Sequence, residues 1–206
     1  MSFHTILTPL AVATLVLLSA CSGSEPTPTT NAPNVVKTIG SDIRAENIGG
    51  PFTLTGQNGQ DVSLSDFAGK VVLLSFGYSH CPDICPTNLL TYAQSLSALT
   101  PEEQAKVAVV MVSVDPERDT PAVLGEYVTL FNPQFIGLSS AHPEALAQVM
   151  RAYKITATKV ERDDGDYVMD HSTGSYLIDT KGQARLYEPH GISAEDLTHD
   201  LKTLLE

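Results

Sequence analysis

Two cysteines four positions apart carry the clearest chemical signal in this sequence. Cys81 and Cys85 follow a continuous apolar run at residues 71–77, and each is followed by a proline. The run predicts a buried strand and the residues after Pro86 predict a helix, so both sulfurs are expected near a helix N-terminus. The partial positive charge there favours the thiolate, which is both the nucleophilic and the metal-binding form of cysteine.

Several kinds of chemistry are open to such a pair. Two thiolates alone suit a linear cuprous ion, and an added imidazole would suit both oxidation states of copper, or zinc. A reduced pair could instead exchange disulfides with another protein, and a single activated thiol could reduce a peroxide. A static structural disulfide is the plain alternative, which the proline-framed position at a helix start disfavours.

The rest of the pattern is that of an α/β protein. Strands are expected at residues 71–77, 107–114, 175–179 and 184–188, and helices at residues 86–99, 120–131, 142–153 and 194–205. Residues 51–55 and 61–64 flank a Gly-Gln-Asn-Gly turn signal, which predicts a β-hairpin. Strands joined through helices imply parallel pairs with right-handed crossovers. We therefore expect one thioredoxin-like three-layer α/β domain with an N-terminal β-hairpin at residues 50–206.

Capping residues predict where the helices begin. Thr120 and Ser193 are expected N-caps, and Pro121 fits the first helical position. Pro86 is expected at the same position of its own helix, which would make Cys85 an N-cap-like residue.

The N-terminus resembles a bacterial lipoprotein signal. Residues 1–20 contain no Asp, Glu, Lys or Arg and hold an apolar run of signal-peptide length. Leu18-Ser-Ala-Cys21 resembles a lipobox, which implies cleavage before Cys21 and attachment of lipid to its sulfur. Residues 21–49 are expected to form the lipidated cysteine and a flexible tether, because residues 22–34 are polar and rich in proline. An uncleaved anchor with an incidental Cys21 is the alternative.

Composition excludes several classes of protein. The 206 residues include 24 acidic and 12 basic side chains, for a formal net charge of -12. Such a chain repels a phosphate backbone, so no nucleic-acid partner is expected. A hydrophobic content of 42% and a charged content of 17% are typical of a soluble domain. Three cysteines are too few for a disulfide scaffold.

Three motifs together resemble the Sco/SenC family of copper chaperones in cytochrome oxidase assembly. The motifs are Tyr78-Ser-His-Cys-Pro-Asp-Ile-Cys-Pro86, Ser113-Val-Asp-Pro-Glu-Arg-Asp-Thr-Pro121, and Tyr167-Val-Met-Asp-His-Ser172 leading into Tyr176-Leu-Ile-Asp179. They lie in order within residues 50–206. The resemblance implies one copper ion bound by Cys81, Cys85 and His171. It also implies delivery of that copper to the binuclear site in subunit II of cytochrome c oxidase.

The resemblance extends to partners and location. Another periplasmic copper carrier or a thiol reductant is an expected partner besides the oxidase subunit. The lipid would hold the protein on the extracytoplasmic face of a bacterial membrane, in the periplasm. The alternative function is a thiol-disulfide oxidoreductase, in which Cys81 and Cys85 are a redox pair that keeps the acceptor cysteines reduced. A peroxiredoxin is disfavoured by the two later motifs.

Residues close to the implied ligands have expected roles of their own. Thioredoxins place a cis-proline beside the sulfurs, whereas the loop around Thr173 has none, which leaves space for a metal ion. Asp170 is expected either to hydrogen-bond the His171 imidazole and set its tautomer, or to cap the loop. His80 is expected to point away from the metal, because neighbouring side chains alternate on an extended backbone. Met169 is expected to pack in the core.

Further polar residues are expected to have structural or solvent-facing roles. Residues 115–121 are expected to supply turn and cap chemistry, and residues 163–166 are too few for a calcium loop and are expected at a hairpin tip. The remaining histidines with no evident partner are expected at the surface: His142, His190 and His199.

Overall fold

The computed structural model describes residue 1 and residues 37–206. The predicted signal peptide beyond Met1, the predicted lipid-carrying Cys21 and most of the predicted tether lie outside the described residues. Within residues 37–206 the helices are too short or too polar to cross a bilayer.

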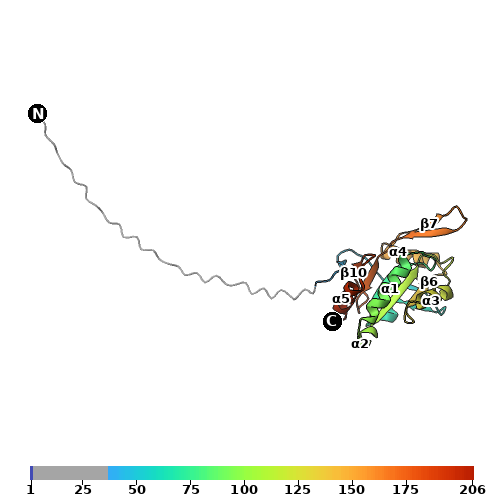
Figure 1. Cartoon of the computed structure of the whole chain (residues 1–206), viewed down its shortest axis with the longest axis horizontal. Coiled ribbons are helices and arrows are strands. Elements are labelled where there is room, and N and C mark those ends of the chain that lie inside the picture. The colour runs from blue at the N-terminus through green and yellow to red at the C-terminus, as the bar shows by residue number, and fades with distance from the viewer. Residues whose placement is uncertain (2–36) are drawn as a thin grey trace. The chain divides into compact units, whose positions relative to one another are not determined.

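An eight-stranded sheet forms the middle of the domain, in the order β1-β10-β9-β4-β5-β6-β2-β3. Figure 1 gives an overview of the domain. The strands β4 (Val71–Gly77), β5 (Val107–Ser113) and β6 (Ile136–Ser139) are parallel to one another. The strands β9 (Ser175–Ile178) and β10 (Ala184–Glu188) continue the sheet in antiparallel pairing beside β4. Every residue of β4 and β5 is buried, as expected for strands covered on both faces.

Three helices cover one face of this sheet: α1 (Ile84–Ser97), α3 (Pro121–Thr129) and α5 (Ala194–Leu205). The helices α1 and α5 pack together, and the Thr198 hydroxyl of α5 donates to the Ser95 carbonyl of α1 at 3.3 Å. The helix α3 lies on β6, where a Cβ at Gly137 would be 2.8 Å from Leu124. Right-handed crossovers from β4 to β5 and then to β6 place α1 and α3 on the same face.

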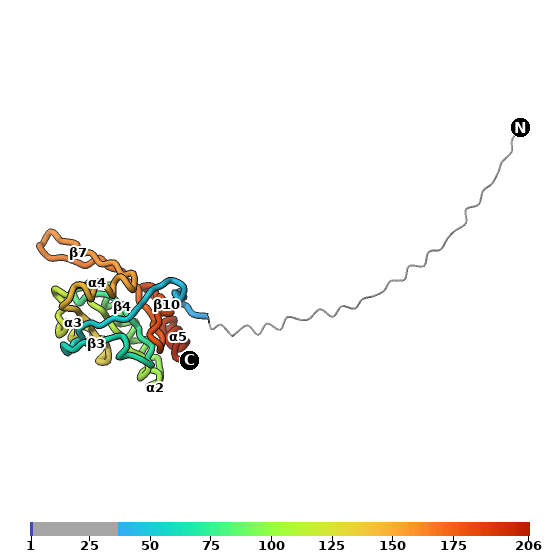
Figure 2. The backbone as a smooth tube through the Cα atoms, turned by 180° about the vertical axis from the view of Figure 1, so that it is seen from behind, coloured from blue at the N-terminus to red at the C-terminus, as the bar shows by residue number. Residues whose placement is uncertain are grey.

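The opposite face is covered by α4 (Pro143–Ala152) and by the segment around residue 50, where the Gly49 N–H donates to the Ala152 carbonyl (Figure 2). The Tyr153 ring, at the end of α4, packs against the rings of Phe76 and Tyr176 with centroids 5.8 and 5.3 Å apart. The short helix η1 (Leu64–Phe67) contributes buried Leu and Phe side chains, and a further single turn, α2 (Pro101–Gln104), precedes β5. The predicted three-layer thioredoxin-like fold is confirmed.

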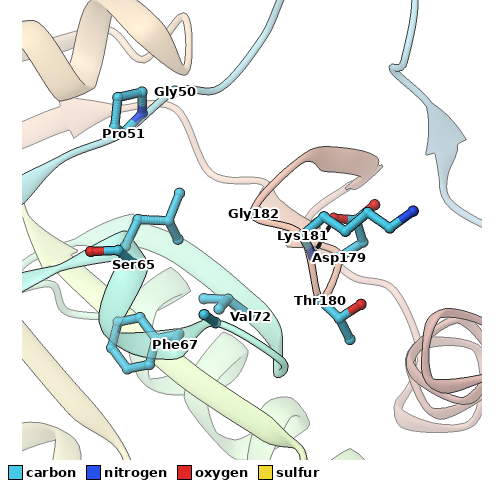
Figure 3. Close-up of a pocket in the computed structure, with 11 residues that line it drawn as sticks. Gly50, Pro51, Ser65, Phe67, Val72, Asp179, Thr180, Lys181 and Gly182 are labelled. Atoms are coloured by element: carbon cyan, nitrogen blue, oxygen red, sulfur yellow. Dashed lines mark hydrogen bonds between the residues drawn. The ribbon is translucent and has the colours of Figure 1, made fainter.

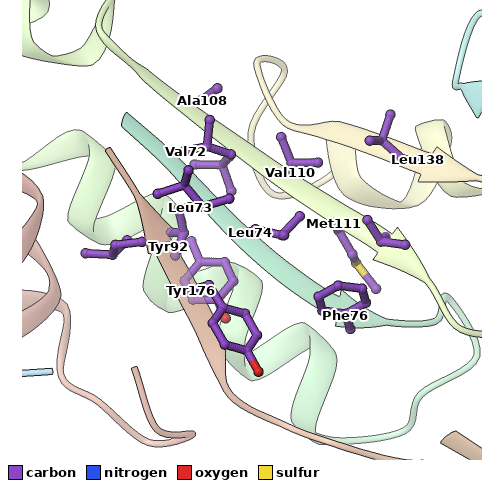
Figure 4. Packing of buried hydrophobic residues seen from close by; sticks show 14 of the residues in the cluster. Val72, Leu73, Leu74, Phe76, Tyr92, Ala108, Val110, Met111, Leu138 and Tyr176 are labelled. Carbon is purple, nitrogen blue, oxygen red and sulfur yellow. The ribbon is translucent and has the colours of Figure 1, made fainter. Parts of the chain in front are cut away.

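The apolar side chains of β4 and β5 form the centre of the core (Figure 4). Val72, Leu74 and Val110 are each at most 1% exposed. Burying one such side chain fully contributes about 1.5–3 kcal/mol to folding. The apolar run that predicts β4 therefore also fixes this strand in the core. The cysteine loop begins at the end of the same strand.

The predicted N-terminal hairpin is present as β2 (Thr53–Gly56) and β3 (Asp61–Ser63). The strand β2 also pairs with β6, so the hairpin extends the central sheet. The strand β6 was not predicted, and neither were the bounds of β7 (Ala157–Glu161) and β8 (Tyr167–His171), although a hairpin tip was expected at residues 163–166. The strand β6 is short and contains Gly137, and β7 is mostly exposed, so none of these strands carries a clear apolar pattern.

The folded domain begins before residue 50, within the segment whose composition predicts a tether. The strand β1 (Ser41–Asp42) pairs with β10 at the edge of the sheet. The Asp200 carboxylate of α5 accepts hydrogen bonds from the backbone N–H groups of Ile39 and Gly40 at 2.9 and 2.6 Å. A two-residue strand held by a buried carboxylate leaves no periodic signal, which is why composition places the domain boundary too late.

Two buried carboxyl groups meet at this edge of the domain. Glu188 of β10 and Asp200 of α5 are both 0% exposed, and neither oxygen of Glu188 has a hydrogen-bond partner among the described residues. Burial, together with the nearby negative charge of Asp200, raises the pKa of Glu188 to about 8. At neutral pH Glu188 therefore holds its proton while Asp200 holds the N-terminal segment.

We predict that folding stability falls as the pH rises from about 4.5 to about 8. Folded Glu188 keeps its proton up to a pKa of about 8, whereas the unfolded chain releases it near its ordinary pKa of 4.5. Urea unfolding measured across this range would show the slope. Glu188→Gln should flatten this slope, reducing the loss of unfolding free energy across the range by a few kcal/mol at most. The exposed control Glu195→Gln should leave the slope unchanged. An identical slope in Glu188→Gln would contradict this assignment.

Candidate metal centre

The cysteine pair lies where β4 ends and α1 begins. The helix starts at Ile84 with Asp83 in the N-cap position, so Cys85 and Pro86 are its second and third residues. The prediction that Pro86 opens the helix and Cys85 caps it was wrong. Proline is tolerated here because the first N–H groups of a helix have no intrahelical acceptor. One of those free groups, the N–H of Cys85, points at Sγ of Cys81 at 3.4 Å.

Three side chains meet at this helix start, as the family resemblance of the motifs implied. Sγ of Cys85 lies 3.6 Å from Nε2 of His171, although the two residues are 86 positions apart. The two sulfurs and the imidazole all lie within 4.8 Å of one another. Donor atoms that each lie about 2.0–2.3 Å from one shared ion are at most about twice that distance from one another, which is close to the spacing of these three atoms. The arrangement can therefore hold one metal ion with only small movements.

The two thiols have opposite tendencies to ionise. Both are free, so the alternative of a static disulfide is not what the structure shows. The hydrogen bond from Cys85 lowers the pKa of the half-buried Cys81 thiol to about 3, with smaller contributions from His171 and backbone N–H groups, although partial burial opposes the shift. The same hydrogen bond, burial and the charge on Cys81 raise the pKa of the Cys85 thiol. The metal-free pair thus carries one negative charge, centred on Cys81.

The imidazole of His171 is oriented by a backbone carbonyl. Its Nδ1 lies 2.8 Å from the carbonyl oxygen of Ser172. A carbonyl oxygen accepts hydrogen bonds and cannot donate them, so Nδ1 carries a proton and Nε2 is the ring nitrogen that faces the sulfurs. Asp170, expected either to be the partner of the imidazole or to cap the loop, lies exposed in β8 and makes no hydrogen bond to the imidazole among the described contacts. The Ser172 carbonyl takes that role instead. A backbone group leaves no signal in the residue types, which is why the sequence did not predict it.

Two residues that sequence reasoning did not single out shape the space around the sulfurs. The Tyr78 ring meets the His171 ring edge-on, with centroids 5.7 Å apart. Gly77 is required by close approach, because a Cβ there would lie 2.7 Å from Sγ of Cys85 and 2.8 Å from Met111. Both residues stand in or beside the first motif, which was the only available signal for them.

The second motif does more than supply turns and caps. The buried Asp119 carboxylate accepts hydrogen bonds from the Ser79 backbone N–H at 3.1 Å, from the Ser79 hydroxyl, and from the Ser113 hydroxyl at 2.6 Å. Ser79 lies two residues before Cys81, so Asp119 fixes the backbone that leads into the cysteine loop. Thr120 also caps α3 as predicted, accepting from the Val123 N–H at 3.3 Å.

The remaining predicted residues lie where they were expected. His80 is exposed, and its Nδ1 pairs with the Ser79 hydroxyl at 2.9 Å. Met169 is half-buried against the core, and residues 163–166 form the tip of the β7–β8 hairpin. The three other histidines are exposed. His190 pairs with Asn88 and His199 with the Lys37 carbonyl, whereas the His142 ring has no hydrogen-bond partner among the described contacts.

One hollow on the described surface adjoins the metal-binding group. It has a volume of roughly 320 Å³ and is mostly apolar, with Ile84, Val168 and Met169 among its lining. Another hollow, of roughly 370 Å³, is lined by residues such as Pro51, Phe67 and Asp179 and contains none of the three candidate ligands (Figure 3). The Asp179 carboxylate there is already paired with Arg185 at 2.7 Å.

We predict that Cys81 reacts with an alkylating reagent already at mildly acidic pH, because its pKa lies near 3. Cys85 should stay unmodified under the same conditions. Mass spectrometry of the metal-free protein after brief alkylation between pH 4 and 9 would measure both. Cys85→Ala should move the Cys81 profile to higher pH, because it removes the hydrogen bond to Cys81. A wild-type profile that rises only above pH 8 would be incompatible with this charge distribution.

The sequence is similar to a family model and to proteins from several organisms. Residues 40–206 match the SCO1/SenC family model. The chain is 42% identical over 131 residues to the mitochondrial SCO1 homolog 1 of Arabidopsis thaliana, covering 64% of this chain but 39% of that relative. It is 37% identical to a SCO2-like protein of Rickettsia prowazekii, with 73% of each chain aligned.

Solved structures show the same relationship. The copper-bound ScoI structure of Bradyrhizobium japonicum is 43% identical, covers 77% of this chain and 99% of that one, and has a TM-score of 0.70. A SCO1/SenC family lipoprotein from Bacillus anthracis is 26% identical, covers 77% of this chain and 95% of that one, and has a TM-score of 0.63. The matched family model spans most of the chain, so the protein belongs to the SCO1/SenC family.

Proposed function

We propose that this protein binds one copper ion through Cys81, Cys85 and His171 and delivers it to the binuclear copper site in subunit II of cytochrome c oxidase. The observation that carries the proposal is the meeting of two sulfurs and an imidazole nitrogen within 4.8 Å. Soft sulfur donors with one nitrogen suit copper in either oxidation state. The similar Bradyrhizobium protein, whose structure contains copper, supports the choice of metal.

Each residue has a distinct part in holding the ion. Cys81 already carries negative charge in the metal-free protein, so it is the first donor to attract a cation. Cys85 is 5% exposed and must release its proton when the ion binds, which makes copper affinity depend on pH. His171 turns its Nε2 toward the ion, because Nδ1 donates to the Ser172 carbonyl. Transfer to the recipient is then an exchange of donors.

The same proposal includes attachment to a membrane. Cleavage before Cys21 and lipidation of its sulfur would tether the domain to the extracytoplasmic face of a bacterial membrane, within reach of a membrane-bound oxidase. The similar protein of Bacillus anthracis, described as a lipoprotein, supports this part of the proposal. Labelling cells with radioactive palmitate would test it, with Cys21→Ser as the variant that should lose the label.

A thiol-disulfide oxidoreductase is the second candidate, favoured by the two free thiols and the acidic pKa of Cys81. Attack of the Cys81 thiolate on an acceptor disulfide would give a mixed disulfide, and Cys85 would resolve it. The protein would end oxidised and the acceptor reduced, so a thiol reductant would have to restore it. This candidate predicts that metal-free protein reduces an oxidised acceptor peptide at a rate insensitive to His171→Ala.

We predict that the reduced protein binds one equivalent of copper, and that Cys81→Ser and Cys85→Ser each abolish tight binding. His171→Ala should weaken Cu(II) binding at least about tenfold, since even residues that only orient a ligand cost that much. Titration with competing chelators and the Cu(II) absorption spectrum would measure this. Exposed His80→Ala is the matched control. A His171→Ala protein with unchanged affinity and spectrum would exclude the three-ligand site.

A further inference from the structure

The β7–β8 hairpin, which carries His171, projects from the body of the domain (Figures 1 and 2). One edge of β8 pairs with β7, whose residues are mostly exposed. The other edge is tied to the domain by two side chains. The Tyr78 hydroxyl accepts from the Met169 N–H at 3.2 Å, and Arg118 Nη1 donates to the Tyr167 carbonyl at 2.9 Å.

Arg118 is the centre of this attachment. Its Nε donates to the Asp115 carboxylate at 2.5 Å, and its guanidinium lies over the Tyr167 ring, 3.6 Å from the centroid. The Tyr167 hydroxyl closes the group by donating to the same Asp115 carboxylate at 2.9 Å. We call Asp115, Arg118 and Tyr167 the arginine latch. The Arg118 side chain is 17% exposed and that of Asp115 is 3% exposed, so solvent screens these contacts little.

The latch is connected to the metal-binding group through Tyr78. The guanidinium of Arg118 lies 5.6 Å from the centre of the Tyr78 ring, and that ring contacts His171 edge-on. Arg118 thus packs between the hairpin and the residue that supports the imidazole. The same loop between β5 and α3 contains Asp119, which holds the backbone before Cys81. One short loop therefore contacts both halves of the site.

We propose that Arg118 is a positioning residue whose latch holds β8, and with it His171, against the two sulfurs. An isolated two-stranded hairpin is marginally stable in water, so without the latch β8 would leave the domain surface for part of the time. The apparent affinity for a ligand equals the intrinsic affinity multiplied by the fraction of protein in the competent conformation. This inference rests on the proposed copper site, because it assigns His171 the part of a copper ligand.

The consequence differs between the two oxidation states of copper. Two thiolates alone can hold Cu(I) in a linear arrangement, whereas Cu(II) requires the added nitrogen donor. Opening the latch should therefore weaken Cu(II) binding and leave Cu(I) binding nearly unchanged. A general loss of structure would weaken both, so the ratio of the two affinities separates positioning from misfolding.

The test compares Arg118→Gln with Arg185→Gln. The control removes a similar arginine–carboxylate pair, Arg185 with Asp179 at 2.7 Å, which makes no described contact with the hairpin. Hydrogen exchange of the metal-free protein should become faster at the Met169 amide in Arg118→Gln alone. If the hairpin is then latched one-tenth of the time, Cu(II) affinity falls about tenfold, with Cu(I) affinity within about twofold of wild type.

The outcomes separate this inference from the proposed function. Unchanged Met169 exchange and unchanged Cu(II) affinity in Arg118→Gln, beside a loss in His171→Ala, would reject the latch and keep the copper site. If His171→Ala has no effect, the three-ligand site fails and the Met169 exchange alone decides the latch. Tyr167→Phe is the second variant if Arg118→Gln folds poorly. It keeps the stacked ring and loses the hydrogen bond to Asp115, so its Met169 exchange rate and Cu(II) affinity should lie between those of wild type and an open latch.

Discussion

Antiparallel pairing of β4 with β9 is the constraint on which the site depends. Ser75 and Ser175 are paired in that ladder, so the chain leaving β4 and the chain entering β9 lie at the same end of the sheet. The first carries Cys81 and Cys85 and the second carries His171. The core packing that fixes this register therefore also brings together donors 86 residues apart, and no direct interaction between the donors is needed to do it.

Close packing at this end of the sheet leaves room for an ion but little for other side chains. A Cβ at Gly77 would press on the Cys85 sulfur, and a Cβ at Gly174 would collide with the Tyr187 ring. Gly174 occupies the region where thioredoxins place a cis-proline, and the described residues contain no cis peptide bond. Gly77 thus leaves room for the Cys85 sulfur, and Gly174 lets the chain pass the Tyr187 ring as it enters β9.

The parts of this structure that sequence reasoning could predict are those with local signals. Apolar runs predict β4 and β5, and the proline-framed cysteines predict a reactive pair at a helix start. His171 could be assigned from the family resemblance and from its place before the strand at residues 175–179 of a thioredoxin-like fold, but not from a local signal, because its position depends on strand pairing. Contacts made by the backbone or by single buried charges left no pattern at all. The Ser172 carbonyl that sets the imidazole tautomer and the Asp200 carboxylate that holds the N-terminal segment are of this kind.

Under the proposed function, burial of the three donors implies an order for copper transfer. Cys85 is 5% exposed, whereas Cys81 and His171 are half-exposed beside an apolar hollow of roughly 320 Å³. Donors from a recipient can therefore replace Cys81 or His171 before they can reach the far side of the ion. Cys85 would release the metal last, and as it does so its raised pKa favours recapture of a proton. Reprotonation of this buried sulfur would lower the affinity of the emptied site for the ion, because the proton competes with the metal for the same sulfur.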